Sequence, residues 1–508
     1  MIDLFDDVND SLWCWENLFN EIISDHIKTR KVKVRTNNQP WMTGDIRKML
    51  NKRYKLFQKA KTSGNNSSTW KAYKQMRNTC TQLIRKSKAE YWKKEFQSCT
   101  NTKTFWQTVK KFKGYSKMSF ISSLQINDSI IVDKKEMANH MNSFFANVGK
   151  NLAHNLPTSA SDNSHIHRVT PTIGEIKLDK ELFSKAFRTA VKPGKACGLD
   201  NITSKDLKLC ETVSIDSLYK VLRKSVISGS FPDKWKTAKV TCVYKKGSKQ
   251  DCSNYRPISL LSIPSKAVER YICSILNDHL ETHNLITPHQ RGFRKNHSTE
   301  NILLHMTERW FKALNKNQVV AVLLIDFKKA FDSVSHPILM KKLSACGVTR
   351  DLHCYLKSYL TSRKQFAKLN NVLSDKTTVE YGVPQGSLIG PTGFSINVND
   401  MADNVCNQKN GNNTEKGELN LFADDTTAHE VGNTVDDVVA KIQGTANEFF
   451  DHSCRNSLTI HPEKCKILIN SRESFVGPLK QVIINNKPIE IVISSKCLGL
   501  TIDSRLSW

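Results

Sequence analysis

The sequence predicts an α+β protein, mostly helical and basic over its first 150 residues and mixed in helices and strands thereafter. Three observations carry this prediction. Apolar residues recur at helical spacing in the N-terminal part, and an unbroken apolar run over 319–325 ends in Asp326. A second strand-like run over 419–423 leads into Asp424 and Asp425. An unbroken run of this length, bounded by polar residues, is typical of a strand buried on both faces.

The bulk composition restricts the classes of protein. With 508 residues the chain is long enough for two or three domains with a substantial core. Its 14 cysteines include no Cys-x-x-Cys pair, so neither a zinc module nor a disulfide framework is supported, and an intracellular, reducing setting is expected. The N-terminus does not resemble a signal peptide, and no apolar run approaches the length that spans a membrane.

The positive charge is large and concentrated. The formal net charge is +28, and between Lys28 and Lys117 there are 25 Lys and Arg against three acids. A chain of this charge binds polyanions, with nucleic acid as the leading candidate. Aromatic residues are interleaved with these cations and allow two readings, base stacking or a helical core. They are Trp41, Tyr54, Phe57, Trp70, Tyr73, Tyr91, Trp92, Phe96, Phe105 and Trp106.

The first 150 residues form the predicted helical basic region or linker. Residues 1–27 are expected to form one amphipathic helix facing a core, and the polar run 63–68 separates two further helical segments. Residues 118–150 are expected to be partly β and then helical. The segment 151–170, rich in Ser, Thr, Asn and His, is the predicted flexible linker. His165 and His167 in this segment could bind a metal ion, but a mobile loop is the favoured interpretation.

The remaining chain alternates helices and strands. We expect a helix over 173–191, a strand over 240–244 with a basic turn after it, and a turn at 382–386 that enters a helix. Thr434 is the expected N-cap of a later amphipathic helix, and residues 461–464 form a turn between strands.

Asp424 and Asp425 are predicted at the tip of a β-hairpin. Neighbouring carboxylates repel each other, so a fold that holds them together usually supplies a cation, and Mg²⁺ prefers such oxygen ligands. If the strand ending at Asp326 lies beside this hairpin, three carboxylates can hold two metal ions for phosphoryl transfer. The alternative is a solvated Asp-Asp turn.

Taken together, the motifs resemble those of reverse transcriptases, above all the non-LTR (LINE-type) retrotransposon polymerases. The likeness covers roughly residues 175–508. Three palm motifs carry it, at 326–332, 382–387 and 422–425, and flanking blocks extend it at 195–200, 254–261, 290–299, 458–464 and 497–508.

This resemblance implies a right-hand polymerase fold. Residues 171–318 would form the fingers and the start of the palm, and residues 319–508 a palm truncated before the thumb. The implied activity is that of an RNA-directed DNA polymerase that uses two Mg²⁺ ions, with Mn²⁺ as an alternative. Asp326, Asp424 and Asp425 would be the catalytic metal ligands. The implied partners are an RNA template, a DNA primer and dNTPs, with no membrane; oligomeric state is not predicted.

The resemblance also assigns nucleotide-binding residues. Arg256 and one of Lys245 or Lys246 would bind the triphosphate. Lys464 would lie near it as a proton donor to the leaving pyrophosphate. A surface role for each lysine stays open. Phe331 would exclude a ribose 2′-hydroxyl, or else be an ordinary core residue.

Gln385 and Gly386 belong to the turn that approaches nucleotide and template. The family usually continues with a leucine-rich helix, but this chain has Thr392, Gly393, Ser395 and Asn397, which predicts weaker packing behind the site.

Other departures keep an alternative function open. His461 replaces an expected Asn, the basic segment resembles the linker after an endonuclease of which no sign is present, and the chain stops at Trp508 within the last palm block. A truncated, weak or inactive remnant that only binds nucleic acid is the main alternative. An intron-encoded maturase would need an extension not seen here.

Overall fold

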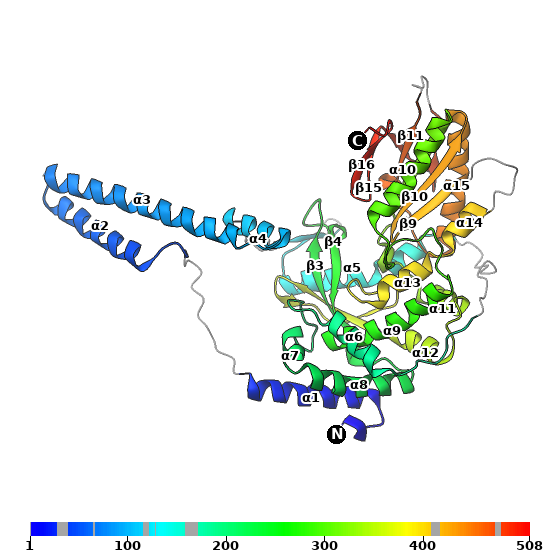
Figure 1. Ribbon diagram of the computed structural model, residues 1–508, viewed down its shortest axis with the longest axis horizontal. Coiled ribbons are helices and arrows are strands. Elements are labelled where there is room, and N and C mark those ends of the chain that lie inside the picture. The colour runs from blue at the N-terminus through cyan, green and yellow to red at the C-terminus, as the bar shows by residue number, and fades with distance from the viewer. Residues whose placement is uncertain are drawn as a thin grey trace. The chain divides into compact units, whose positions relative to one another are not determined.

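The chain consists of two compact units. The computed structural model describes residues 2–27, 39–64, 67–114, 121–126, 129–157, 171–407, 417–472 and 479–507 (Figure 1). One unit, hereafter the main unit, combines Met1–His26 with Ile121–Trp508, and the other, the basic unit, is Ile27–Phe120. The expected linker at 151–170 falls largely outside the described residues, as do His165 and His167.

A five-stranded sheet forms the centre of the main unit's C-terminal half. Its order is β14 (Glu490–Val492), β11 (Lys466–Asn470), β5 (Val319–Ile325), β10 (Asp425–Gly432) and β9 (Glu418–Phe422). The central strand β5 runs antiparallel to both β10 and β11.

Alternate residues of β5 face opposite sides, as strand geometry requires. Val320 and Val322 pack in a cluster with α10 (Thr299–Asn315), whereas Ala321 and Leu323 share the main core with α15 (Val435–Arg455). The predicted strand buried on both faces is confirmed.

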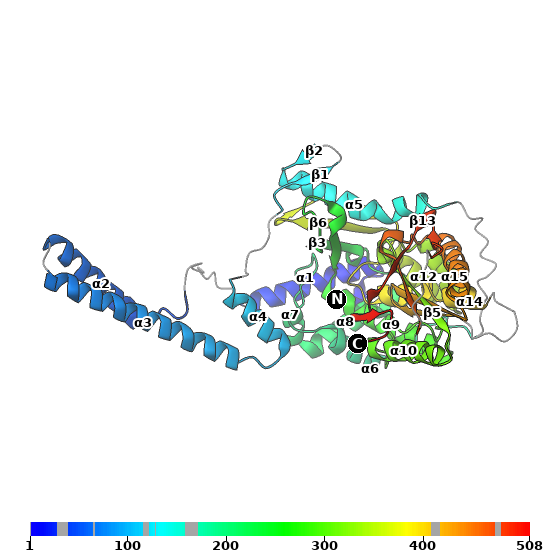
Figure 2. The same ribbon diagram turned by 90° about the horizontal axis from the view of Figure 1, so that it is seen from above.

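A second sheet of the main unit carries the predicted basic turn. Its order is β4 (Tyr255–Leu260), β3 (Thr237–Tyr244), β6 (Arg363–Leu369) and β7 (Val372–Leu373), with β8 (Thr377–Val379) also paired to β6. α5 (Lys134–His154) covers this sheet through Met141 and Phe145, which pack with Val240 and Leu369. Figure 2 shows α5 beside β3 and β6.

A helical layer completes the main unit. Its structure differs from two expectations, the extent of the N-terminal basic region and the start of the helix expected over 173–191. α1 (Val8–His26) packs through Trp15 on α8 (Glu211–Ile227), where the indole N–H donates to Ser217 Oγ at 2.9 Å. Residues 1–26 and 121–150 therefore do not group with the basic region. The helix expected over 173–191 is α6 (Lys180–Ala190), because the Asp179 carboxylate caps it at Lys180.

The other elements of the described residues are short or connect the layers. The helices are α7 (Ser204–Leu209), α9 (Ile263–Thr282), α11 (His336–Ala345), α12 (Arg350–Leu360), α13 (Ile389–Asn397) and α14 (Met401–Asn407). The strands are β1 (Leu124–Ile126), β2 (Ser129–Ile131), β12 (Ile483–Ile484), β13 (Lys487–Pro488), β15 (Ser494–Cys497) and β16 (Leu500–Asp503). None of the described helices is long and apolar enough to cross a membrane.

The basic unit contains α2 (Gly44–Thr62), α3 (Ser67–Gln97) and α4 (Thr102–Phe112). The break between α2 and α3 lies where the polar run predicts it. Most of its aromatic rings contact one another: Phe57 packs on Trp70 and Tyr73, and Trp92 on Trp41. These contacts favour packing of the rings with one another, although none of the ten predicted aromatic side chains is fully buried, and Tyr54, Phe105 and Trp106 are exposed.

A buried ion pair joins α11 to the chain after α13. Lys342, 4% exposed at its side chain, lies 2.6 Å from Asp400 and also donates to the Asn397 carbonyl. Asp400 contacts His452 of α15 at 3.5 Å. Burial would raise the pKa of Asp400, but Lys342 and His452 outweigh it and hold that pKa below its usual value.

Replacing Lys342 with alanine should destabilise the main unit strongly. The change removes the buried lysine from the Asp400 carboxylate while His452 stays next to that carboxylate, and breaking such a buried pair typically costs about 3–5 kcal/mol in the free energy of unfolding. Chemical denaturation followed by circular dichroism measures the loss. The neighbouring Lys341 is exposed, so Lys341→Ala should change stability by less than about 0.5 kcal/mol. Equal midpoints for the two variants would contradict a stabilising role of the pair.

Candidate active site

Strand pairing brings the three predicted acids to one edge of the central sheet. Thr426 of β10 pairs with Ile325 of β5, so Asp425 and Asp326 follow next on the two strands. β9 and β10 form an antiparallel hairpin in which Phe422 pairs with Asp425, and Ala423 turns with φ of +60°. The predicted hairpin and its position beside the strand ending at Asp326 are confirmed.

A neighbouring segment supports the acidic turn. Its main chain joins the edge of β9, with hydrogen bonds from Leu421 N–H to the His289 carbonyl and from Arg291 N–H to the Leu421 carbonyl, both at 2.9 Å. The fully buried Gln290 accepts from Ala423 N–H at 3.2 Å through Oε1. Gln290 belongs to the block at 290–299 that carries the family resemblance, but nothing else in the sequence indicates its role at the acidic turn.

Burial and mutual repulsion both act on the acids. Burial raises the pKa of Asp424, and the negative charge of Asp326 raises it further. Burial likewise raises the pKa of Asp425, and the charges of Asp424 and Asp326 add to this. The protein therefore holds negative charges close together in a partly desolvated place, where a cation would be bound favourably.

Basic groups from two other elements face these acids. Partial desolvation lowers the pKa of Lys245, as do the charges of Arg256 and Lys464, whereas Asp326 opposes the shift. Arg256 and Lys245 in turn offset the rise at Asp424. Lys464 Nζ lies 3.7 Å from the Asp326 carboxylate. Lys245, one of the two turn lysines, lowers the pKa values of Asp424 and Asp425.

Phe331, five residues after Asp326, is half-buried. Its ring stacks on Phe394 of α13 with 4.7 Å between ring centroids, and it meets Phe293 edge-on at 6.1 Å. Contact on one side and partial exposure on the other fit a residue whose ring presents a fixed edge to a neighbouring ligand.

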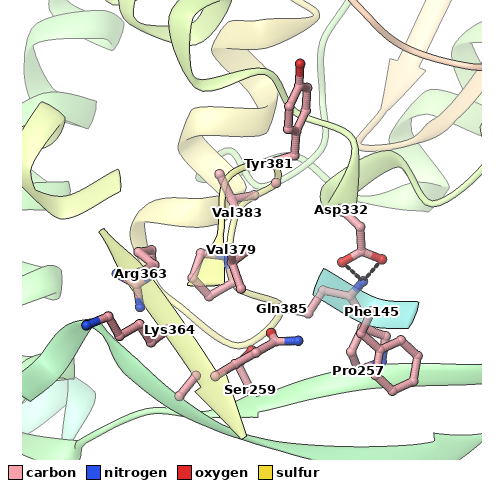
Figure 3. Close-up of a pocket in the computed structure, with 14 residues that line it drawn as sticks. Phe145, Pro257, Ser259, Asp332, Arg363, Lys364, Val379, Tyr381, Val383 and Gln385 are labelled. Carbon is pink, nitrogen blue, oxygen red and sulfur yellow. Dashed lines mark hydrogen bonds between the residues drawn. The ribbon is translucent and has the colours of Figure 1, made fainter. Parts of the chain in front are cut away.

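The turn before α13 is tied to the second sheet and to the loop after Asp326. Ser259 N–H of β4 donates to the Gln385 carbonyl at 2.8 Å. Gly386 has φ of +125°, and a Cβ there would lie 2.6 Å from the Ser259 carbonyl oxygen, so only glycine fits. The Gln385 side chain points toward Asp332 at the edge of a cavity of about 40 Å³ (Figure 3).

A buried carboxylate that sequence reasoning missed fixes the start of α13. Glu269 of α9, 1% exposed, accepts from Leu388 N–H at 2.8 Å and from Ser265 Oγ at 3.1 Å. Burial raises its pKa, and the hydrogen bond from Leu388 opposes that rise. Its only sequence signal was an acid at a position where α9 is otherwise apolar.

The acids suit a metal that is shared with a substrate. Across the described residues, no three His, Cys, Asp or Glu side chains are grouped to hold one ion by themselves. Mg²⁺ in phosphoryl-transfer sites is commonly held by one or two carboxylates together with water and substrate phosphates. The repelling acids at 326, 424 and 425, faced by basic groups that attract phosphate, fit this donor set.

Carboxylates faced by lysine and arginine on a mixed helix-and-strand scaffold are compatible with phosphoryl-transfer chemistry. The family described as "Reverse transcriptase (RNA-dependent DNA polymerase)" matches residues 243–499. The chain therefore belongs to this family. A second family, described as "Female sterile protein K10 C-terminal domain", matches residues 42–102 in the basic unit.

Similar proteins come from mobile elements. The chain is 29% identical over 62% of its length to "Probable RNA-directed DNA polymerase from transposon BS" of Drosophila melanogaster, covering 34% of that protein. It is 28% identical over 65% of its length to "RNA-directed DNA polymerase from mobile element jockey" of Drosophila funebris, covering 35% of it. The chain thus spans about a third of the length of these relatives.

Adding a methyl group at Gly292 should displace the acidic turn. A Cβ at Gly292 would collide with the backbone nitrogen of Ala423, which cannot move without moving the turn. Gly292→Ala should therefore lower the melting temperature, with a loss above about 1 kcal/mol. Gly444→Ala in α15 is the matched control, because a Cβ there meets open space. It should stabilise by about 0.5–1 kcal/mol; equal effects of the two changes would contradict the close contact.

Proposed function

We propose that the main unit is an RNA-directed DNA polymerase that extends a primer 3′-hydroxyl with deoxynucleotides. The main support for this proposal is the pairing of β5 with β10, which brings the acids together near the basic groups of the β3–β4 hairpin. In this proposal the sheet around β5 is the palm, and the sheet around β3 belongs to the fingers. Membership of the reverse transcriptase family supports the proposal.

Asp326 and Asp424 would hold two divalent ions, Mg²⁺ or alternatively Mn²⁺, with Asp425 beside them. Bound there, such ions would lower the pKa of the primer hydroxyl and stabilise charge on the triphosphate. Arg256 offers a planar fork for phosphate oxygens and Lys245 a compact charge. Lys464, beside Asp326, is suited to protonate the leaving pyrophosphate.

Phe331 would select the sugar. Its stacking on Phe394 and its edge contact with Phe293 hold the ring in place. A fixed ring at this point would leave room for a deoxyribose and clash with a ribose 2′-hydroxyl.

The basic unit would add nucleic-acid binding. On α2, α3 and α4, Lys and Arg outnumber acids by 18 to 3, and the one acid–lysine pair at hydrogen-bond distance among the described residues there joins Lys48 to Asp45. Most of the aromatic rings contact one another, whereas the lysines and arginines are mainly exposed. This supports contacts to phosphates more than base stacking, and so little dependence on base sequence.

Removing either principal acid should abolish primer extension. Asp326→Ala and Asp424→Ala each delete a proposed metal ligand while relieving repulsion, so the protein should stay folded. The measurement is Mg²⁺-dependent dNTP incorporation on an RNA template, with circular dichroism as the folding check. Asp436→Ala, an exposed acid in the first turn of α15, should leave extension intact. Full primer extension by the Asp326→Ala, Asp424→Ala double variant would contradict the proposal.

Neutralising exposed lysines of α3 should weaken RNA binding and flatten its salt dependence. The variant replaces Lys71, Lys74, Lys86 and Lys93 with Gln in the full chain. Each phosphate contact removed should reduce the slope of log affinity against log salt by about 0.7–0.9. Fluorescence anisotropy with RNA at several salt concentrations measures it.

The control for this variant removes the same charge from the main unit. Lys185, Lys205, Lys208 and Lys341 are exposed there, and their replacement by Gln should leave the slope nearly unchanged. Equal slopes for the two variants would mean that net charge alone, and not the basic unit, determines binding.

A further inference from the structure

Lys329, in the loop after Asp326, contacts the hairpin that carries the proposed triphosphate ligands. Its Nζ donates to the Tyr255 carbonyl at 3.0 Å and to the Ser253 carbonyl at 3.2 Å. Tyr255 is the first residue of β4, and Arg256 follows it. The ammonium group therefore ties the segment after β5 to the base of the basic turn between β3 and β4.

The backbone of Lys329 is fixed in a conformation that is uncommon for lysine. Its φ is +49°, in the left-handed region. The Lys329 carbonyl accepts from Asp332 N–H at 2.9 Å, and the N–H of the preceding residue, Lys328, donates to the Thr459 carbonyl at 2.8 Å. A residue other than glycine stays in this region only where its surroundings hold it there. The side chain of Lys329 thus starts from a fixed point.

The basic turn, residues 245–254, is closed by its own hydrogen bonds. Asn254 Nδ2 donates to the Ser248 carbonyl at 3.0 Å, and the Asn254 carbonyl accepts from Lys245 N–H at 2.9 Å. Because these bonds connect the parts of the turn, a contact at its base constrains the whole turn. The position of Lys245, and of the adjoining Arg256, therefore depends on how the base is held.

Lys329 is held in place although other cations lie near it. Burial lowers the pKa of its ammonium group; the charge of Asp332 opposes this, whereas those of Lys245 and Arg256 lower the pKa further. The Phe144 ring of α5 lies 5.8 Å from Nζ, and the face of such a ring attracts a cation. Two of the three donors of the ammonium group are engaged by carbonyls. The group is thus suited to hold the turn.

We propose that Lys329 is a positioning residue that fixes the basic turn relative to the acids, and so determines where Arg256 and Lys245 meet the triphosphate. The inference rests on the proposed polymerase function. Its consequence is that affinity for the incoming nucleotide depends on a residue that does not touch the nucleotide. Affinity for the primer–template, which is not assigned to this turn, should be independent of Lys329.

The test is Lys329→Met in the full chain. Methionine keeps an unbranched side chain but donates no hydrogen bond, so the turn loses its tie to the loop. The KM for dNTPs should rise about 10-fold, the order for one charge-assisted contact, with kcat and the Kd for primer–template within about 2-fold of wild type. Lys329→Arg keeps the charge and the donors and should restore most of the affinity for dNTPs. An active Lys329→Met variant with an unchanged KM would overturn this inference alone.

Lys135→Met is the matched control. Lys135 also donates to a main-chain carbonyl, that of Leu373 in β7 at 3.0 Å. β7 and β4 lie at opposite ends of the strand order of the second sheet, so this contact does not hold the basic turn. The control should change neither KM nor kcat. A similar rise in KM for both variants would contradict a specific role of Lys329.

A double variant separates positioning from direct contact with the nucleotide. Arg256→Lys weakens the proposed triphosphate contact but keeps its charge. Adding Lys329→Met to Arg256→Lys should raise KM by less than Lys329→Met does alone, because residues that act through one another are not additive. An equal further rise would mean that Lys329 binds the nucleotide independently, and would overturn the positioning role. A wild-type chain that makes no product would overturn the polymerase proposal, and this inference with it.

Discussion

The antiparallel pairing of β5 with β10 is the constraint on which the candidate site depends. Residues of β5 are buried alternately against α10 and α15. A slip of one residue would turn every side chain of a strand to the opposite face, so the two helices fix the register. That register places Asp326 and Asp425 next to each other after Ile325 and Thr426. The position of the acids is therefore determined by apolar packing some distance from them.

The strand on the other side of β5, β11, is preceded by a lysine that lies at the same edge of the sheet. β11 pairs Lys466 with Leu324, and the short turn before it holds Lys464 close to Asp326. His461 N–H donates to the Asp326 carbonyl at 2.8 Å, which fixes this turn to the end of β5. Acids thus arrive from one side of the central strand and a lysine from the other. The raised pKa values of Asp424 and Asp425 are offset by other cations, by Arg256 and Lys245 at Asp424 and by Lys245 at Asp425.

Features with a local signal could be predicted from the sequence, and those set by distant contacts could not. The apolar run at 319–325 and the Thr434 cap are local patterns, and both are present. The start of α6 was misplaced because Ile173, apolar and helix-compatible, instead pairs with Val348 far along the chain. Likewise, the apolar face of α1 indicated burial but not its partner, α8. Gln290, Glu269 and Asp332 act through residues more than 50 positions away, so no spacing rule identifies them.

The polar residues of α13 show how the site tolerates an unusual helix. Thr392 donates to Asn277 Oδ1 at 3.0 Å, so its hydroxyl is satisfied. By contrast, the buried Ser395 hydroxyl and Asn397 amide have no hydrogen-bond partner among the described residues, and such groups cost about 1–3 kcal/mol each. The cost falls at the C-terminal end of α13. The N-terminal end, next to Gln385, is held by the hydrogen bond from Leu388 to Glu269. The unsatisfied polar groups therefore lie about two helical turns from the Gln385 turn, although Phe394, next to Ser395, stacks on Phe331.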